Sequence, residues 1–364
     1  MTSHKDREEA RAAFLKEAGW DTATRAPIAG DASTRTYVRL DRNGMSAILM
    51  DWPPGADAAP PPGQKPYSQV AHLAEDCRPF IAVGTYLRNL NLSAPEIYAQ
   101  DADRGFLLLE DLGAEVLGPI IDQGKASDGT SLEEIYHLAI DVILTVQANG
   151  APAALPVGDG TSHNVPAFDD SVYRAEIDMI PDWYFPVVRE RELGVEERAG
   201  YHALWTGLRP VIDAGPQTLF LRDFHSPNIL WLSDRQGPAR IGLIDYQDAL
   251  IGSRAYDIVS LLQDARRDVP RARESALLAY YVTRASATLQ GFDEQEFRAS
   301  YAVLGAERAL RLIGLWPRLL KRDNKPHYMA HMPRTIDYLD RNLAHPALGA
   351  LAGWLKAQAG LGNS

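Results

Sequence analysis

The stretch LRDFHSPN at positions 221–228 carries residue types that phosphoryl transfer requires. Asp223 follows Arg222, and Asn228 lies five residues after the acid. An aspartate in such a loop accepts the proton of an attacking hydroxyl, and an amide oxygen five residues later binds a metal ion. Asp245 ends the apolar run IGLI, where its carboxylate is a suitable ligand for Mg²⁺. Together these residues predict a phosphoryl-transfer site rather than an ordinary proline-containing turn.

A turn of small residues, GDAST at positions 30–34, lies between two segments rich in β-branched residues. Small side chains let the backbone N–H groups of such a turn approach phosphate oxygens closely. A plain hairpin connection would explain the same residues, but the turn precedes the other segments that carry chemistry. We therefore expect contacts with nucleotide phosphates from Gly30, Asp31, Ser33, Thr34 and Arg35.

The segment LLLEDLG at positions 107–113 ends an apolar strand and begins a polar connector. Backbone groups at such an exit can form hydrogen bonds with the edge of an adenine base. The candidates for these contacts are the backbones of Glu110 and Leu112. The alternative is an ordinary strand end with two solvated acids.

The composition is that of a globular protein of 364 residues, of which 46% are hydrophobic and 23% charged. The formal net charge of −11 argues against nucleic acid or an anionic membrane as a partner, because either would need a basic face. Cys77 is the only cysteine, so we expect a packing residue and no disulfide framework. The first residues are charged, and no apolar run approaches the roughly 18 residues that span a bilayer. We expect a cytoplasmic protein.

Periodicity divides the chain into two lobes. Residues 1–112 should form a nucleotide-binding lobe with three antiparallel strands, a proline-rich loop at 51–66, a helix at 75–90 and two further strands. Residues 113–364 are mainly helical, with helices near 170–190 and 293–315 among others, and contain one embedded hairpin. The fold prediction is therefore α+β, with a small antiparallel β-rich N-terminal lobe. The larger helical lobe should carry the catalytic loop and the acceptor site.

In this order, GDAST, LLLEDLG, LRDFHSPN and LIDYQD resemble the motifs of the aminoglycoside-phosphotransferase-like branch of the protein-kinase fold. AILMDWPP, LIDYQDALIGSRAYDIVSLLQDAR and ERALRLIGLWPRLLKRDNKPHYMAHMPR further resemble bacterial anomeric sugar kinases, which phosphorylate C1 of N-acetylmuramate and N-acetylglucosamine in cell-wall recycling. The resemblance implies an enzyme that uses ATP, Mg²⁺ and a small amino sugar. Under it, Asp223 is the catalytic base, and Asn228 and Asp245 hold magnesium. We expect a monomer.

The sequence departs from that kinase pattern at several positions. Leu221 stands where protein kinases have a histidine, and Tyr246 and Gln247 replace the Phe-Gly pair after the metal aspartate. The strand AILM ends at Met50, where the fold usually carries a phosphate-binding lysine. Kinases need positive charge beside the β and γ phosphates. We therefore hypothesise that Arg35 partly replaces the lysine, although a solvated arginine is an equal alternative.

Two segments are candidates for the acceptor site. ERALRLIGLWPRLLKR concentrates basic residues in an acidic protein, which favours an anionic acceptor group such as the lactyl carboxylate of N-acetylmuramate. AEIDMIPDWYFP offers carboxylates and aromatic rings for sugar hydroxyls and sugar faces. Packing and internal ion pairs would also explain both segments. The candidate acceptor residues are Glu176, Asp182, Trp183, His225, Arg308, Arg311 and Arg318.

Two other functions fit parts of the sequence. The first is a kinase for another small hydroxyl compound, such as choline, homoserine or an antibiotic. The second is a non-catalytic nucleotide-binding regulator, which the missing lysine favours. Against the regulator, Asp223, Asn228 and Asp245 are all present, and a degenerate site has no chemical reason to keep all three.

Overall fold

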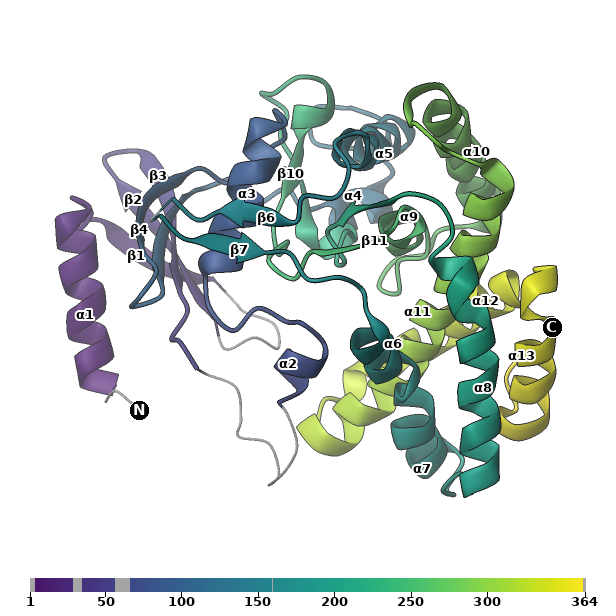
Figure 1. Ribbon diagram of the computed structural model, residues 1–364. Coiled ribbons are helices and arrows are strands. Elements are labelled where there is room, and N and C mark those ends of the chain that lie inside the picture. Colours follow the sequence, from purple (N-terminus) through teal and green to yellow (C-terminus); the bar gives the residue numbers. More distant parts are fainter. Residues whose placement is uncertain (1–3, 29–34, 56–65, 159, 363–364) are drawn as a thin grey trace.

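The computed structural model describes residues 4–28, 35–55, 66–158 and 160–362, which form two lobes (Figure 1). The smaller lobe holds an antiparallel sheet with helix α1 (His4–Glu17) on its outer face, and the larger lobe is mostly helical. This is the predicted α+β arrangement. No helix in these ranges is long and apolar enough to cross a membrane.

The sheet of the small lobe has the strand order β1-β2-β3-β5-β4. Its strands are β1 (Thr24–Ile28), β2 (Thr36–Arg42), β3 (Met45–Asp51), β4 (Ile97–Asp101) and β5 (Phe106–Glu110). β2 and β3 form a hairpin through Asn43 and Gly44, whose positive φ angles of 54° and 79° suit a tight turn. The five strands confirm the prediction of three strands followed by two more.

Strand β3 sends alternate side chains to opposite faces of the sheet. Leu49 packs with Phe14 of α1 in the outer apolar cluster. Met50 is fully buried and belongs to the main cluster, together with Phe80 of helix α3 (Arg78–Asn89). The strand is therefore covered on both faces, and its end carries no cation.

The large lobe is organised around the long helix α11 (Glu294–Asp323). The other helices of this lobe are α4 (Leu117–Gln123), α5 (Leu132–Ala148), α6 (Asp170–Ile177), α7 (Phe185–Val188), α8 (Val195–Ile212), α9 (Ala255–Leu262), α10 (Arg271–Thr288), α12 (Met332–Leu343) and α13 (Gly349–Trp354). α11 contacts α6, α8, α9 and α12. A residue on one face of α11 can therefore reach several parts of the lobe.

Two predicted helices differ from the structure in extent. The helix predicted at 170–190 is interrupted, because α6 ends at Ile177 and a π-helical turn, Ile180–Tyr184, precedes α7. Pro181 is the second residue of that turn and has no N–H to continue an α-helical ladder. The helix predicted at 293–315 instead continues to the end of α11.

Short antiparallel pairs are nested inside the helical lobe. They are β8 (Gln217–Phe220) with β11 (Leu250–Ser253), and β9 (Ile229–Trp231) with β10 (Ile241–Leu243). The sequence predicts one hairpin here; the structure has two concentric pairs, because residues 221–228 loop out between β8 and β9. A further pair, β6 (Ala154–Pro156) with β7 (Ser162–Asn164), was not predicted, since strands of three residues leave little periodicity.

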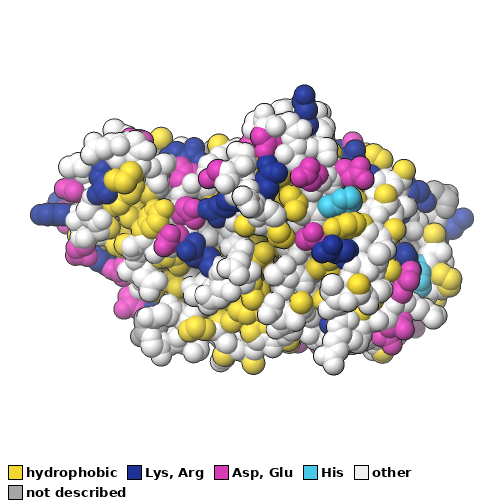
Figure 2. Space-filling model, turned by 90° about the horizontal axis from the view of Figure 1, so that it is seen from above, with side chains coloured by type: hydrophobic (Ala, Val, Ile, Leu, Met, Phe, Trp, Pro, Cys, Tyr) yellow, Lys and Arg dark blue, Asp and Glu magenta, His cyan; other side chains and the backbone are white. Residues whose placement is uncertain are grey.

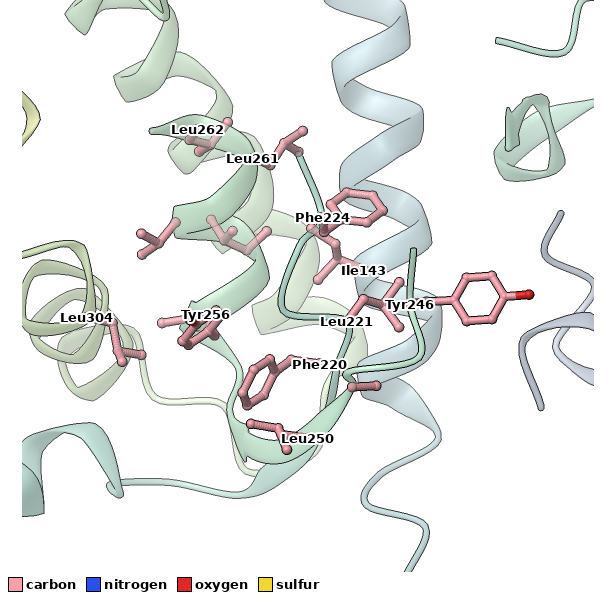
Figure 3. Close-up of a cluster of buried hydrophobic side chains, with 14 of the residues drawn as sticks. Ile143, Phe220, Leu221, Phe224, Tyr246, Leu250, Tyr256, Leu261, Leu262 and Leu304 are labelled. Carbon is pink, nitrogen blue, oxygen red and sulfur yellow. The ribbon is translucent and has the colours of Figure 1, made fainter. Parts of the chain in front are cut away.

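Apolar side chains surround the start of the loop at 221–228 (Figure 3). They include Phe220, Leu221, Phe224, Tyr256 and Leu261. Tyr246 points away from this cluster and stacks on Phe80 of α3, with ring centroids 4.7 Å apart. A β-carbon at Gly84 would lie 2.4 Å from the Tyr246 hydroxyl, so this glycine allows the close approach. Tyr246 therefore joins the two lobes directly after Asp245.

Residues 67–74 belong to the N-terminal part of the sequence but contact the large lobe. This segment begins with the short helix α2 (Tyr67–Val70). The carbonyl of Ala71 accepts a hydrogen bond of 2.8 Å from Arg222, and the N–H of Ala74 donates to Asp248 at 2.6 Å. The segment is thus anchored next to the loop at 221–228.

Acidic and basic side chains are intermingled on the face of the molecule shown in Figure 2. Many arginines of the described residues are paired with carboxylates, including Arg235 with Glu110 and Arg240 with Asp128. An arginine that lacks such a partner is therefore informative. Cys77 is fully buried, and burial raises the pKa of its thiol to about 12, as expected for a packing residue.

Candidate active site

The loop between β8 and β9, called the Asp223 loop below (residues 221–228), is fixed by a buried carboxylate. Asp257, in the first turn of α9, accepts hydrogen bonds from the backbone N–H groups of Leu221 at 2.6 Å and Arg222 at 3.0 Å. Arg222 has a φ of 70°, which is uncommon for a residue other than glycine. The two bonds to Asp257 hold this strained backbone in place.

The side chain of Arg222 points into the protein. It donates hydrogen bonds to the carboxylate of Glu176 at 2.7 Å and to the carbonyl of Ala71. Glu176 is fully buried and also accepts a hydrogen bond from Arg311 at 3.1 Å. Burial raises the pKa of Glu176, but the guanidinium groups of Arg311 and Arg222 outweigh it and hold the pKa below its usual value. The structure therefore places Glu176 inside an ion-pair network and not on an open wall of the site.

Asp223 is half-buried and lies among cations. Burial raises the pKa of its carboxyl group, whereas His225 and the guanidinium groups of Arg311 and Arg308 lower it to about 2. The carboxylate is therefore ionised at neutral pH and can accept a proton. The backbone carbonyl of Asp223 also accepts a hydrogen bond of 3.1 Å from Asn228.

Asn228 and Asp245 lie side by side. The Asn228 Nδ2 and Asp245 Oδ2 atoms are 3.3 Å apart. The backbone N–H of Ile244 donates to the carbonyl of Asn228 at 3.2 Å, so pairing of β9 with β10 fixes this approach. Asp245 itself has a φ of 60°, a second strained non-glycine residue in the site. The structure thus brings together the three residues at which phosphoryl-transfer chemistry was predicted.

The donor chemistry of this pair fits a magnesium ion. A carboxylate and an amide oxygen are hard ligands, and Mg²⁺ is usually held by one or two carboxylates together with substrate phosphates and water. The described residues contain no group of three or more His, Cys, Asp or Glu side chains that could hold a metal alone. A metal at Asp245 would therefore depend on phosphate and water oxygens as well.

Arg35 reaches this pair from the small lobe. Its Nη2 atom donates a hydrogen bond of 2.8 Å to Asp245 Oδ1, and its guanidinium carbon lies 4.7 Å from the centroid of the Trp52 ring. Gln247 donates to the same Asp245 oxygen at 3.0 Å. Met50 of β3 is fully buried, so the cation beside Asp245 comes from the residue that precedes β2 and not from β3.

His225 lies between two arginines. Its Nδ1 is 3.4 Å from Arg308, and its Nε2 is 3.3 Å from Arg266 and from Asn228. Burial lowers the pKa of His225 to about 4, although Asp223 opposes this shift. The imidazole is therefore neutral at pH 7 and contributes hydrogen bonding to the Asp223 loop without adding charge.

The basic residues on α11 recur at positions 308, 311 and 318, a spacing that places them along one face of the helix. Arg308 is buried, and its Nε and Nη1 atoms have no hydrogen-bond partner among the described residues. Arg311 is bound to Glu176, as described above. Arg318 lies between aromatic rings, with its guanidinium carbon 4.8 Å from the Tyr67 centroid and 5.9 Å from that of Trp183.

Asp182 does not join this group. It is exposed, and its carboxylate accepts a hydrogen bond of 2.6 Å from Arg198. The neighbouring Trp183 is half-buried and faces Arg318 instead. The structure therefore separates two adjacent acceptor candidates, because successive residues of a helical turn point in different directions.

Comparison with known proteins identifies the family. A profile of the phosphotransferase enzyme family matches residues 24–299. The chain belongs to this family. The N-acetylmuramate/N-acetylglucosamine kinase of Caulobacter vibrioides is 36% identical to it over 97% of both chains. A protein of the same name from Pseudomonas aeruginosa is 33% identical over 93% of this chain and 90% of its own.

Solved structures confirm the fold of this phosphotransferase. A choline/ethanolamine kinase family protein from Mesorhizobium loti has a TM-score of 0.55 at 14% identity and covers 96% of this chain and 99% of its own. The GDP complex of aminoglycoside 2'-phosphotransferase-IIIa has a TM-score of 0.56 at 14% identity and covers 93% of this chain and 99% of its own. At this identity the likeness concerns the fold alone. The resemblance drawn from the sequence motifs is thereby confirmed at the level of family and fold.

Backbone and apolar contacts hold the connector that follows β5, within residues 107–113. The N–H of Glu110 donates to the carbonyl of Glu96 at 2.8 Å, which fixes the end of β5. Leu112 packs with Leu230, Leu232 and Ile244 in a small apolar cluster. Such a cluster next to a backbone edge is suited to the flat face of a base.

Several predicted nucleotide contacts fall outside the described residues: Gly30, Asp31, Ser33 and Thr34. Conversely, the sequence reasoning missed three residues that shape the site. Asp257 and Asp264 bind the backbone of the Asp223 loop, the latter through the N–H of Ser226 at 2.9 Å. Both could have been noticed as acids within the apolar helix segment AYDIVSLLQDA. Tyr67 gave no signal, since it follows the proline-rich stretch.

Proposed function

We propose that this phosphotransferase is an ATP-dependent kinase that phosphorylates the anomeric C1 hydroxyl of N-acetylmuramate and N-acetylglucosamine. The products would be the α-1-phosphates, made in the cytoplasm during peptidoglycan recycling. The observation that carries the proposal is that Asp223, Asn228 and Asp245 lie next to one another in the folded structure. It is supported by the name of a relative that is 36% identical over 97% of both chains.

Asp223 is the proposed catalytic base. An anionic carboxylate at this point can orient the acceptor hydroxyl and take its proton. A pKa of about 2 makes Asp223 a weak base, but phosphoryl transfer has a loose transition state in which the nucleophile needs positioning more than deprotonation. The bonds from Asp257 to Leu221 and Arg222 supply that positioning, because they fix the backbone on which Asp223 stands.

The nucleotide would lie between the lobes. Mg²⁺ bound by Asn228 and Asp245 would neutralise charge on the β and γ phosphates. Arg35 would add positive charge from the small lobe, where Met50 provides none. The turn at 30–34 would cover the phosphates, and the backbones of Glu110 and Leu112 would hold the adenine.

A second candidate is a choline kinase activity, since a choline/ethanolamine kinase family protein shares the fold. A cationic acceptor is disfavoured by the basic face of α11, where Arg308 and Arg311 lie close enough to Asp223 to lower its pKa. A non-catalytic regulator is disfavoured because both strained residues, Arg222 and Asp245, are retained at the positions that catalysis would use.

An ATP-consumption assay with a panel of acceptors tests the proposal. The panel contains N-acetylmuramate, N-acetylglucosamine, other hexoses, choline and an aminoglycoside, each with Mg²⁺. We expect turnover with the two amino sugars, and phosphorus NMR of the product should show the phosphate on C1. Turnover with choline alone would replace the proposed acceptor, and no turnover with any compound would favour a regulator.

A further inference from the structure

Two arginines of α11, Arg308 and Arg318, form no ion pair with a carboxylate of the described residues, and Arg318 is the one that is not fully buried. Arg311 is paired with the buried Glu176, and Arg322 with Asp323 at 2.7 Å. Within the described ranges, Arg318 forms no ion pair with a carboxylate. It is half-buried, and burial together with the charge of Arg322 lowers its pKa. A partly buried guanidinium without an anion is costly unless a ligand supplies one.

Two aromatic rings hold this guanidinium group. Tyr67 comes from the segment before α3, and Trp183 comes from the π-helical turn after α6. Their ring centroids lie 4.8 Å and 5.9 Å from the guanidinium carbon of Arg318. Cation–π contacts of this kind fix an arginine without neutralising it. The side chain is therefore pre-organised, and its charge remains available to an anionic partner.

The location of Arg318 relative to Asp223 suits one sugar ring. Arg311 is close enough to Asp223 to lower its pKa, and seven residues of helix separate Arg311 from Arg318, about 10 Å along the axis. The phenol of Tyr67 raises the pKa of both arginines, so it lies near both. Ala71, four residues after Tyr67, is bound by Arg222 next to Asp223.

We propose that Arg318 binds the carboxylate of the acceptor sugar, with Tyr67 and Trp183 as the walls against which the sugar packs. This inference rests on the proposed sugar kinase function. N-acetylmuramate carries a lactyl carboxylate one ring away from its C1 hydroxyl, whereas N-acetylglucosamine has a hydroxyl in place of the lactyl group. A guanidinium group forms charge-assisted, bidentate bonds with a carboxylate. Arg318 therefore determines the preference between the two sugars.

The first test compares kcat/KM for both sugars in wild type and Arg318→Gln. We expect kcat/KM for N-acetylmuramate to fall by about 10- to 100-fold, the usual effect of losing a charge-assisted hydrogen bond. The value for N-acetylglucosamine should stay within about threefold, and its turnover also shows that the variant is folded. Arg322→Gln is the matched control, because Arg322 is exposed and paired with Asp323 one turn further along; it should leave both sugars unchanged.

The second test changes the substrate instead of the binding residue. The methyl ester of N-acetylmuramate keeps the shape of the acceptor but removes its charge. Wild type should lose about 10- to 100-fold in kcat/KM with the ester, and Arg318→Gln should use ester and acid almost equally. Equal use of ester and acid by wild type, or equal losses for both sugars in Arg318→Gln, would overturn the inference. Failure of the proposed function would look different, since wild type would then phosphorylate neither sugar.

Discussion

Arg35 donates a hydrogen bond of 2.8 Å to Asp245, which lies 210 positions later in the chain. The bond runs from the residue before β2 to the second residue after β10, and it joins a cation of the small lobe to a carboxylate of the large lobe. Both side chains are at least partly buried, at 11% and 34% exposed. Positive charge is therefore present beside the proposed phosphate site, although the strand that usually supplies it ends in Met50.

Replacing Arg35 by alanine should weaken the use of ATP. Loss of a charge-assisted bond to phosphate predicts an increase in the KM for ATP on the order of tenfold and a fall in kcat. Steady-state kinetics with N-acetylglucosamine as acceptor measure both. Arg25→Ala is the control, because Arg25 is exposed on β1. Unchanged constants in Arg35→Ala would show that another group carries the phosphate charge.

Replacing Asp223 by asparagine should remove turnover and spare nucleotide binding. An amide cannot take the hydroxyl proton, so kcat should fall by roughly 10²- to 10⁴-fold. Calorimetric titration with ATP and Mg²⁺ should give an affinity close to that of wild type, because Asn228 and Asp245 remain. Asp234→Asn, a change at an exposed acid after β9, should leave kcat unaltered. Full activity in Asp223→Asn would reject Asp223 as the base.

The order of the elements and the central residues of the site could be predicted from sequence, because their signals are local. Asp223, Asn228 and Asp245 have fixed spacing, each next to a short apolar run, and the strands that carry them have to pair. The strand alternation around the Asn43-Gly44 turn is equally local. These features depend on the backbone and on nearest neighbours, which the sequence displays directly.

The acceptor side could not be assigned in the same way, because its residues differ only in long-range contacts. Three candidates on one face of α11 have the same side chain: Arg308, Arg311 and Arg318. The structure separates them through Glu176 and Tyr67, which lie more than a hundred positions earlier in the chain. Likewise, Glu176 and Asp182 are both acids in one segment, yet one is fully buried and the other is exposed. Burial of that kind depends on tertiary packing.

The difference in burial between Glu176 and Asp182 predicts very different effects of their substitution on stability. Glu176→Gln leaves Arg222 and Arg311 buried without a full counter-charge, so the free energy of unfolding should fall by about 3 kcal/mol or more. Asp182→Asn removes an exposed partner of Arg198 and should cost less than about 1 kcal/mol. Urea unfolding at pH 7 measures both. Similar losses in the two variants would show that the buried network is not what holds the Asp223 loop.

Asp257 predicts a pH dependence of stability. Burial raises the pKa of its carboxyl group to about 7, and the N–H groups of Leu221 and Arg222 only partly oppose this shift. In the unfolded chain the same carboxyl group loses its proton near the ordinary aspartate pKa of 3.8. Between these values the native state binds more protons than the unfolded state, so stability falls as the pH rises from about 4 to about 7 and then levels.

Asp257→Asn removes this titration while keeping the shape of the side chain and one acceptor oxygen. The free energy of unfolding of wild type, taken relative to the variant, should therefore decrease between pH 4 and pH 7 and remain constant above pH 8. Urea unfolding of both proteins at half-unit pH intervals gives this difference. The other ionisable groups titrate in both proteins, so their contributions cancel in the difference. The two backbone donors favour the ionised form, so a difference that rises with pH would mean that these donors outweigh burial. In that case Asp257 holds the Asp223 loop as a full carboxylate throughout the neutral range.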